Sequence, residues 1–575
     1  MNYIGNRAFG HVWVADFEYG QDANGLHDIR CMVARDLVSG ERVRLWADEL
    51  AALDRAPFGN EADELVVAFY AAAEMGCFRA LGWPAPANVL DLYAEFRCLT
   101  NGLKLPAGEG LLGALVFFGL DAMAGAEKEE MRQLAIRGGD YITEERNALL
   151  DYCERDVDAT AKLFSVMAAR IDGDRSLVRG RYAESVARME AIGVPVDKEL
   201  IAGFYAERDA IRALLVEKLD TIGVFEDGSF RIARLREWVE QSGITDWPKT
   251  PTGQNKADED TLKEMALRFP ALESLRQLMA TLAQLRAGEL FVGADGRNRA
   301  MLSPFRSKTG RNQPSTATFI FGAPHWMRRF IRPPDGAALA YIDWEQQEFG
   351  IAAALSGDSA MLAAYESDDP YLAFAKMAGA VPAGATKKTH QTEREMYKTA
   401  ALAVLYGMRF RGLSRRLGVS VAQAKHLLEQ HRSVFPRYWE WSERMLDYGR
   451  LTGSLHTTFG WMIHVTRETR TTTLQNWPMQ ANGAEMLRIA CILAHQRDVP
   501  VCAPVHDAVL VEASVDSIES AVTAMRGAMD RASRIVLDGF TLRTDVQIVR
   551  HPDRWPIAKG RAVWDIVAAH LVVEP

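Results

Sequence analysis

The sequence lacks the cysteine pairs and the long apolar runs that mark several classes of protein. Its six cysteines are scattered along 575 residues without a C-x-x-C pair, which argues against a zinc site or a disulfide framework and predicts reduced core thiols. No apolar run approaches the ~20 residues that span a bilayer, and residues 1–20 lack a basic-then-apolar signal pattern. We therefore expect a cytoplasmic protein without a membrane partner.

Repeats and low-complexity tracts are also missing. The composition, 48% hydrophobic and 25% charged, is that of an ordinary globular protein. Because 575 residues exceed what one hydrophobic core usually supports, the length predicts two or more domains.

Charge is distributed unevenly along the chain. The net charge is −9, but residues 1–175 hold 29 acidic and 17 basic side chains, so the remainder is slightly basic. Residues 297–332 contain eight bases and no acid, and residues 409–437 contain seven bases and one acid, Glu429. One such run is most simply a solvated helix face; two runs beside the motifs described below favour contact with nucleic-acid phosphates.

Apolar periodicity divides the chain into an α/β part, a helical part and a second α/β part. Residues 12–20 alternate like a strand, and residues 61–81 and 144–170 have the pattern of helices. Residues 174–299 are almost wholly helical, with amphipathic stretches at 177–192 and 258–285. A loop at residues 247–253 interrupts them.

The second α/β part begins with an apolar run at residues 337–344 that is typical of a buried strand. Helices are expected from residue 358 to about residue 451, and residues 504–513 have the pattern of a strand or hairpin. Asp343 lies at the end of the first strand and Asp507 within the last segment. Two such carboxylates can bridge a pair of Mg²⁺ ions about 4 Å apart, although an acid at a strand end is also an ordinary turn former.

Between these acids, residues 394–407 are expected to be helical, and four-residue spacing places Arg394, Lys398, Leu402 and Tyr406 on one face. The guanidinium of Arg394 and the ammonium of Lys398 could bind a triphosphate. Leu402 and Tyr406 could then pack against a sugar and a base. The alternative is an exposed basic edge with Leu402 and Tyr406 in the core.

Residues 341–358, 394–407 and 505–512 resemble, in order, motifs A, B and C of the family A DNA polymerases. Residues 309–311 and 476–487 are similar to two further blocks of that family. The resemblance implies that Asp343 and Asp507 hold two catalytic Mg²⁺ ions, helped by a backbone carbonyl of Ile342 or Trp344. Arg394 and Lys398 would bind the incoming triphosphate, and Lys398 would also protonate the departing pyrophosphate.

The same resemblance assigns the remaining nucleotide and DNA contacts. Glu348 matches the steric gate that rejects ribonucleotides, Leu402 would lie near the sugar, and Tyr406 would pack at the templating position. The residues that would contact the primer-template are Arg311, Asn476, Gln480 and His506.

Three residues depart from the family pattern. Leu402 replaces a usual aromatic residue, Ala508 stands where an acid usually follows the motif C aspartate, and Tyr371 stands where a phosphate-contacting histidine is expected. None of these changes removes a primary metal ligand, so we expect activity with altered substrate tolerance.

The N-terminal part contains a second group of acids. Asp16 and Glu18 lie on the same side of the strand at residues 12–20, so both could bind one pair of metal ions. An exposed acidic strand face would show the same spacing. Tyr152 and Asp156 stand four apart on a predicted helix and resemble the third motif of the DEDDy 3′→5′ exonucleases. Residues 67–82 resemble the second motif, with Glu74 where that family has aspartate.

This second resemblance implies that Asp16, Glu18, Glu74 and Asp156 hold two further metal ions, Mg²⁺ or Mn²⁺, while Tyr152 orients the attacking water. Glutamate is one methylene longer than aspartate but offers the same carboxylate. A nearby acid, Asp91, is interpreted as structural.

The architecture implied is a multidomain α/β protein: an RNase H-like exonuclease domain at residues 1–175, followed by a right-hand polymerase. We expect a thumb at 176–300, a palm at 301–350 and 476–575, and fingers at 351–475. The chain begins almost directly with the first exonuclease strand, so no 5′-nuclease domain is expected.

The function implied is template-directed nucleotidyl transfer to a primer 3′ end with 3′→5′ proofreading. The expected partners are primer-template DNA and deoxynucleoside triphosphates, and the expected state is a monomer. Compact proteins of this layout resemble those of bacteriophages and prophages, which would place the protein in a bacterial host cell. The alternatives are a polymerase with a scaffold-only exonuclease domain, a nuclease with a DNA-holding platform, and a non-enzymatic nucleic-acid-binding subunit.

Overall fold

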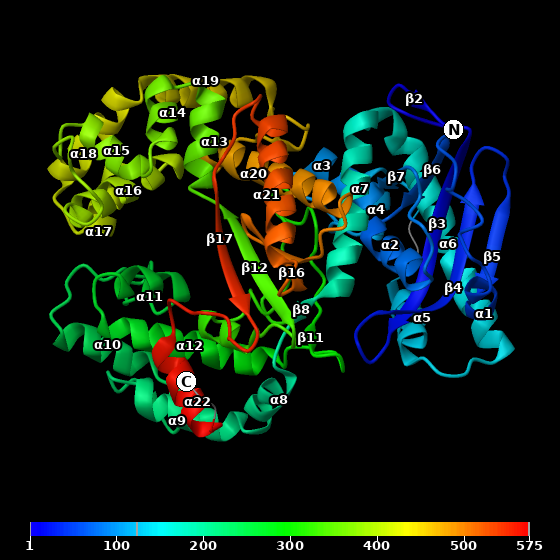
Figure 1. Cartoon of the computed structure of the whole chain (residues 1–575), viewed down its shortest axis with the longest axis horizontal. Helices are drawn as coiled ribbons and strands as arrows, with labels where there is room; N and C mark the ends of the chain where they lie inside the picture. The colour runs from blue at the N-terminus through cyan, green and yellow to red at the C-terminus, as the bar shows by residue number, and fades with distance from the viewer. Residues whose placement is uncertain (1, 122–124, 573–575) are drawn as a thin grey trace.

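Two β-sheets organise the fold, one in the N-terminal part and one near the centre of the molecule. The computed structural model describes residues 2–121 and 125–572 (Figure 1). In Figure 1 the N-terminal sheet lies at the right, the central sheet in the middle, and two groups of helices at the upper and lower left. In the described part of the chain, no helix is both long and apolar enough to cross a membrane.

The N-terminal sheet has five strands in the order β5-β4-β3-β6-β7. Their bounds are β3 His11–Gln21, β4 His27–Asp36, β5 Arg42–Trp46, β6 Glu64–Ala68 and β7 Val89–Asp91. β3, β6 and β7 run parallel, whereas β4 and β5 are antiparallel to their neighbours. Trp13 and Phe17 of β3 belong to one buried cluster and Val12 and Val14 to another, so both faces of the sheet are covered.

Residues 61–81, predicted as a helix, contain a strand and then a helix. β6 (Glu64–Ala68) precedes α2 (Ala71–Ala80), so the prediction was wrong for its first part. The four residues Leu65 to Ala68 are fully buried. A continuous apolar run is what a parallel strand covered on both faces requires, and periodicity alone cannot distinguish it from a helix. Tyr70, in the left-handed conformation with φ of 74°, turns the chain from strand to helix.

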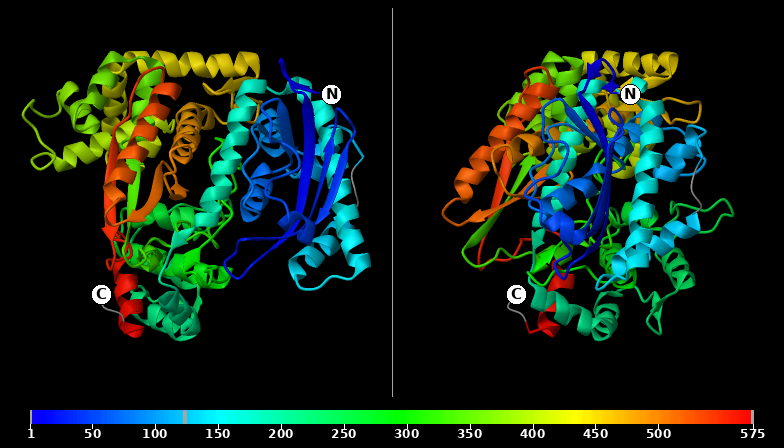
Figure 2. Two further views of the ribbon diagram at one scale, coloured as in Figure 1. Left: turned by 45° about the vertical axis from the view of Figure 1, so that its right-hand side comes forward. Right: turned by 90° about the vertical axis from the view of Figure 1, so that its right-hand side faces the viewer.

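Two long helices confirm the other N-terminal predictions. α6 (Thr143–Met167) packs on β3 and β4. α7 (Gly173–Ile192) contacts α2 and β7 on one side and α20 and β15 on the other. Figure 2 shows α7 standing between the two sheets, so this helix connects the N-terminal part to the rest of the molecule.

The central sheet has four antiparallel strands in the order β15-β16-β12-β17. They are β12 (Ala337–Trp344), β15 (Val501–Val505), β16 (Ala508–Ser514) and β17 (Thr544–Arg550). The predicted strand at residues 337–344 and the predicted hairpin are confirmed. α21 (Ile518–Val536) covers one face of this sheet and packs along α20 (Thr471–His495).

The upper group of helices in Figure 1 follows β12 and begins at Gln347, earlier than the predicted start at residue 358. It consists of α13 (Gln347–Ser356), α14 (Ser359–Glu366), α15 (Pro370–Met377), α16 (Gln391–Leu405), α17 (Phe410–Leu417), α18 (Val421–Val434) and α19 (Pro436–Thr452). The lower group consists of α8 (Lys198–Ala206), α9 (Arg208–Leu219), α10 (Ile232–Gln241), α11 (Glu259–Ala266), α12 (Ala271–Ala287) and α22 (Arg561–His570).

The stretch at residues 258–285 is divided into α11 and α12, with Pro270 as the residue that precedes α12. Proline lacks the backbone N–H that a helix interior needs, and this explains the break. The C-terminal helix α22 packs against α9, in the lower group, although residues 476–575 were assigned to the same unit as the central sheet. The other domain boundaries stay predictions.

Smaller elements complete the structure. They are β1 (Tyr3–Ile4), β2 (Arg7–Ala8), α1 (Ala47–Ala51), α3 (Leu92–Thr100), α4 (Leu111–Phe117), α5 (Gly125–Arg137), η1 (Ala168–Arg170), β8 (Val194–Pro195), β9 (Phe225–Glu226), β10 (Ser229–Phe230), β11 (Arg297–Asn298), η2 (His325–Phe330), β13 (Ser454–His456) and β14 (Met462–His464).

Candidate functional site

The central sheet brings Asp343 and Asp507 together. Asp343 lies near the end of β12, and Asp507 occupies the two-residue turn between β15 and β16. β12 pairs with β16 so that Asp343 is opposite Ala508, the residue after Asp507. The N–H of Trp344 donates to the Asp507 carbonyl at 3.4 Å. We call Asp343, Asp507 and their surroundings the central site.

The electrostatics of Asp343 suit a divalent cation. Burial raises the pKa of this carboxyl, and the charges of Asp507 and Asp545 raise it further. Its Oδ1 atom is buried without a hydrogen-bond partner among the described residues. Clustered carboxylate oxygens are the donors that Mg²⁺ prefers, and a cation would relieve the repulsion, so the residues present fit a bound metal ion.

Helix α16 presents the predicted cations. Arg394 is buried: its Nε donates to Asp369 at 2.7 Å, another guanidinium nitrogen pairs with Glu395, and the group lies over the Tyr371 ring at 5.4 Å. Lys398 keeps 39% of its side chain exposed, with Glu395 at 3.9 Å. Arg394 is thus fixed in place, whereas Lys398 is accessible to a substrate.

Three segments meet at Glu348, in the first turn of α13. The Tyr406 hydroxyl, just after α16, donates to Glu348 Oε1 at 3.0 Å. Gln480 of α20 donates to the same oxygen at 3.2 Å. Tyr406 itself is exposed and Leu402 is half-buried. Hydrogen bonding therefore fixes the Glu348 carboxylate beside the face of α16 that carries Lys398.

The predicted DNA-contacting residues lie in different environments. His506, in the β15–β16 turn, lies within electrostatic reach of Asp507 and Arg311. Asn476, by contrast, is 8% exposed, and its Nδ2 atom is buried without a partner in the described part of the chain. A DNA contact by Asn476 stays a prediction.

The two basic runs differ in how their charges are used. In the first run, Arg297 forms a bidentate pair with Glu512 at 2.8 Å, and Arg299 pairs with Asp295 at 2.6 Å. Acids from outside the run thus pair with these two residues, and phosphate contact by this run stays a prediction. All seven basic residues of the second run, at 409–437, are exposed.

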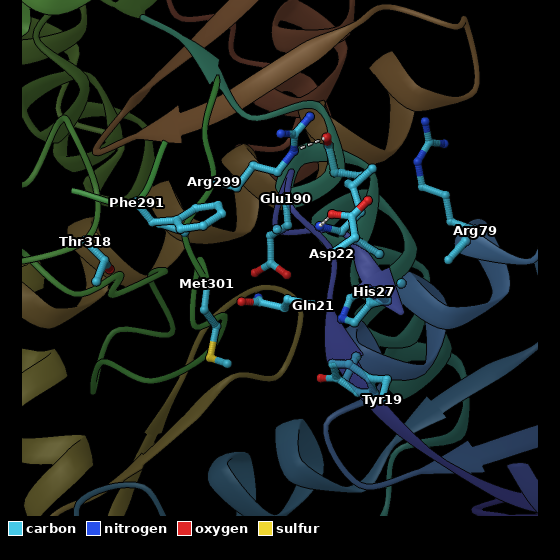
Figure 3. A pocket seen from close by; sticks show the side chains of 18 of the residues that line it. Tyr19, Gln21, Asp22, His27, Arg79, Glu190, Phe291, Arg299, Met301 and Thr318 are labelled. Carbon is cyan, nitrogen blue, oxygen red and sulfur yellow. Dashed lines mark hydrogen bonds between the residues drawn. The ribbon is translucent and has the colours of Figure 1, made fainter. Parts of the chain in front are cut away.

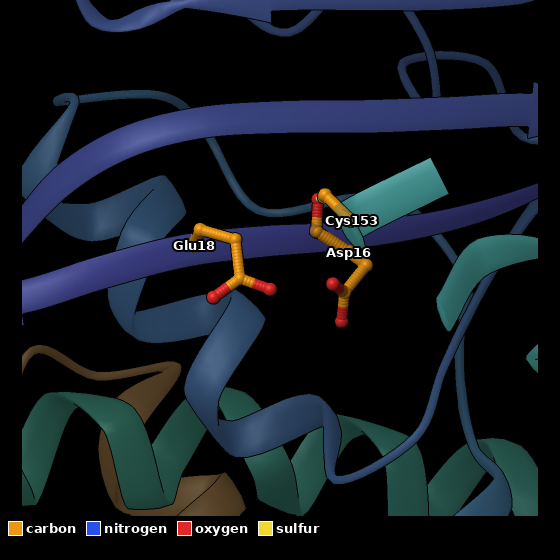
Figure 4. A group of neighbouring side chains, drawn as sticks. All are labelled: Asp16, Glu18 and Cys153. Atoms are coloured by element: carbon orange, nitrogen blue, oxygen red, sulfur yellow. The ribbon is translucent and has the colours of Figure 1, made fainter. Parts of the chain in front are cut away.

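The second group of acids gathers on β3, beyond the end of its neighbour β6. β6 pairs with β3 only as far as Val14, so Asp16 and Glu18 extend past the end of β6. Figure 4 shows the carboxylates of Asp16 and Glu18 on the same side of the strand. Together with Cys153 of α6 they offer ligand atoms that lie within 4.8 Å of one another. We call Asp16, Glu18, Glu74, Tyr152 and Asp156 the N-terminal site.

Helix α6 supplies two members of the N-terminal site. Burial raises the pKa of Tyr152, as do the neighbouring charges of Asp156 and Glu18, so the phenol stays protonated. Burial likewise raises the pKa of Cys153, whose thiol donates to the carbonyl of Asp16 at 3.2 Å. A neutral thiol is a poor ligand for a hard cation, and we interpret Cys153 as a contact that holds β3 against α6.

Glu74, in the first turn of α2, is the most buried acid of this group. Its exposed fraction is 3%, and Oε2 has no hydrogen-bond partner among the described residues. Burial raises its pKa well above the ordinary value, and the charges of Asp16 and Glu18 raise it further. An orphaned oxygen beside clustered carboxylates fits a bound divalent cation here too.

Asp91 is different, as expected. Its side chain accepts from the N–H groups of Tyr70 and Tyr93 and caps α3. These bonds hold α3 against the start of α2, which is a structural role.

A cavity of about 820 Å³ adjoins the N-terminal site. In Figure 3 side chains from β3, β4, α7 and the segment after α12 surround it, including Tyr19, His27, Glu190, Phe291 and Met301. The rings of Tyr19 and His27 meet edge to face, with centroids 4.2 Å apart. Ala73, next to Glu74, also lines the cavity, so the cavity is part of the surroundings of Glu74.

Sequence reasoning missed Asp545 and Asp369, which neighbour the central site. Asp545 pairs with Asp343 across β12 and β17. Asp369 caps α15 and holds Arg394. The alternation of residues 544–550 would have revealed a strand, and Asp369-Pro370 a helix start, but neither pattern identifies the spatial neighbour.

Known proteins resemble this chain in sequence and in fold. Residues 304–551 match the family model described as DNA polymerase family A. The thermostable DNA polymerase I of Thermus aquaticus is 25% identical over 477 residues, covering 75% of this chain and 54% of that protein. The DNA polymerase of Mycobacterium phage L5 is 24% identical over 321 residues, covering 53% and 51%. The chain thus spans about half the length of these relatives.

A solved structure extends the similarity to nearly the whole fold. The POL domain of Pol1 from M. smegmatis, in complex with a DNA primer-template and dNTP, superimposes with a TM-score of 0.68. The match covers 95% of this chain and 96% of that one at 19% identity. The chain therefore has the mixed α/β fold of that domain, the N-terminal part included.

Proposed function

Because residues 304–551 match the family model of the family A DNA polymerases, we propose that this protein extends the 3′ end of a primer by template-directed addition of deoxynucleotides. The observation that carries the proposal is that the β12–β16 register brings Asp343 next to the β15–β16 turn that carries Asp507. The relative from M. smegmatis was solved with primer-template DNA and dNTP, which supports the same partners here.

The roles of the residues follow from their positions. Asp343 and Asp507 would hold Mg²⁺, which would supply charge stabilisation at the reacting phosphate and activate the primer hydroxyl. Arg394, fixed by Asp369, would bind the triphosphate as a forked donor. Lys398 is free to approach the same phosphates and to protonate the leaving pyrophosphate. Glu348, held by two hydrogen bonds, would exclude a ribose 2′-hydroxyl.

The test replaces the metal-holding acids. Asp343→Asn or Asp507→Asn should lower primer extension at least ~10³-fold, since each change removes a charged ligand from the transition state. Asp516→Asn, an exposed acid after β16, is the matched control and should extend like the wild type. Extension by either site variant within tenfold of the wild type would contradict the proposal.

We also propose 3′→5′ exonuclease activity, because Asp16, Glu18, Glu74, Tyr152 and Asp156 come from three separate elements to one place. Asp16, Glu18, Glu74 and Asp156 would hold divalent ions, Mg²⁺ or Mn²⁺, and the protonated phenol of Tyr152 would orient the attacking water. A polymerase whose N-terminal part is only a scaffold is the alternative.

The two possibilities differ in one experiment. The wild-type protein should shorten a single-stranded 3′ end with Mg²⁺ or Mn²⁺, and EDTA should stop it. Failure with both metals would leave the N-terminal part as a scaffold, while the polymerase proposal would keep its own test. A monomeric state and a cytoplasmic location stay predictions.

A further inference from the structure

A third carboxylate, Asp545, flanks Asp343 on the side away from Asp507. β12 lies between β16 and β17, and the register places Asp343 opposite Ala508 on one side and opposite Asp545 on the other. Residues opposite each other in antiparallel strands point to the same face, with Cβ atoms about 4.5–5.5 Å apart. The side chain of Asp545 thus emerges beside that of Asp343, whereas the residue on the other flank has no carboxylate.

The surroundings of β17 fix this orientation. Thr544 is buried and its hydroxyl accepts from Arg526 Nε of α21 at 2.9 Å, so the face that carries Thr544 packs on α21. Asp545 and Gln547 alternate onto the opposite face and are exposed. A shift of the strand by one residue would bury the Asp545 carboxylate against α21, and this penalty holds the register.

The carboxylate of Asp545 can coordinate a cation. Its Oδ1 accepts from the N–H of Val546 at 2.9 Å, and no other hydrogen bond or ion pair of Asp545 occurs with the described residues. The Asp343 Oδ1 beside it is buried and unpartnered within the same part of the chain. The nearby Arg543 does not neutralise Asp545, because its guanidinium binds Glu345 and the carbonyls of Tyr365 and Ser367.

We propose that Asp545 is a ligand, directly or through one bound water, of the divalent cation held at Asp343. This inference rests on the proposed polymerase function and adds a residue of this chain to its metal site. The carboxylate that position 508 lacks is thereby supplied from the other neighbouring strand. Ligand partners of this kind typically change metal affinity tenfold or more.

The test measures metal binding without turnover. Every protein carries Asp16→Ala and Glu18→Ala, which remove the N-terminal metal ligands, and is assembled with a dideoxy-terminated primer-template and a matching dNTP. Free Mn²⁺ is followed by electron paramagnetic resonance. Asp545→Asn should weaken Mn²⁺ binding at the central site about tenfold. Asp516→Asn removes one exposed acid elsewhere and should leave it unchanged.

A second variant separates ligation from simple attraction. Asp545→Glu keeps the charge but moves the carboxylate by one methylene, so a ligand role predicts that binding stays at least threefold weaker than in the parent. Full recovery by the glutamate variant would overturn the proposal, as would unchanged binding by the asparagine variant. Asp507→Asn in the same assay tests the central metal site separately from the role of Asp545. If Asp507→Asn also leaves Mn²⁺ binding unchanged, the central metal site itself is refuted.

Discussion

The central site and the N-terminal site both contain clustered carboxylates, but these carboxylates differ in how deeply they are buried. In the central site the acids lie at strand ends and in a hairpin turn, and Lys398 on a separate helix stays accessible. In the N-terminal site Glu74 is almost wholly buried and lies among other carboxylates. A buried group of like charges is stable only if a proton or a cation compensates it. The comparison indicates that the N-terminal site depends more strongly on metal for its charged form.

The largest expected effect tests whether the two sites work independently. Asp16→Ala combined with Glu18→Ala should abolish metal-dependent shortening of a mismatched primer, by at least ~10³-fold, because both changes remove cation ligands. Extension by the central site should be preserved. The two activities are measured on one preparation with end-labelled DNA, and Asp54→Ala with Glu61→Ala, two exposed acids of the same region, is the control. A parallel loss of extension would show that the two sites do not work independently.

The next effect addresses Glu74, where burial is greatest. Glu74→Ala should be nearly as damaging to excision as the double variant, since it deletes a ligand. Glu74→Asp should retain activity if the longer side chain is an accommodated variant. Rates of single-strand shortening over a Mg²⁺ titration measure both. Equal loss in the two variants would show that the site requires the length of glutamate.

The third prediction concerns Lys398, the accessible cation of the central site. Lys398→Ala should lower the maximal rate of extension about a hundredfold, because the side chain is asked to donate a proton as well as to bind phosphate. Single-turnover rates over a range of dNTP concentrations separate the two roles. Lys162→Ala, at an exposed position of α6 outside both basic runs, should change neither parameter. A change in apparent affinity alone would show that Lys398 only binds.

The smallest effect concerns selectivity. Glu348→Ala should raise ribonucleotide incorporation relative to deoxyribonucleotide incorporation by about tenfold, since the clash disappears with the side chain. Paired incorporation assays with each nucleotide measure the ratio, and Glu366→Ala at the end of α14 serves as the control. Unchanged selectivity would place the ribose gate elsewhere in the central site.

Much of the fold could be predicted because the decisive signals were local. The apolar run that ends near Asp343 became β12 over the same residues, and α6 and α7 followed their amphipathic patterns closely. Two predictions fail where local patterns are ambiguous. Residues 64–68 resemble part of a helix because a fully buried strand has no alternation, and Pro270 divides the stretch expected to be helical over residues 258–285.

The sequence by itself determined which chemical groups each site would contain, since carboxylates and cations at strand and helix spacing follow from local geometry. Only the tertiary structure decided which of them meet. It paired Arg297 with Glu512, buried Glu74, and set Asp545 rather than an acid at position 508 beside Asp343. Strand order and register join residues about 200 apart through hydrogen bonds and burial, and no local pattern specifies such a partner.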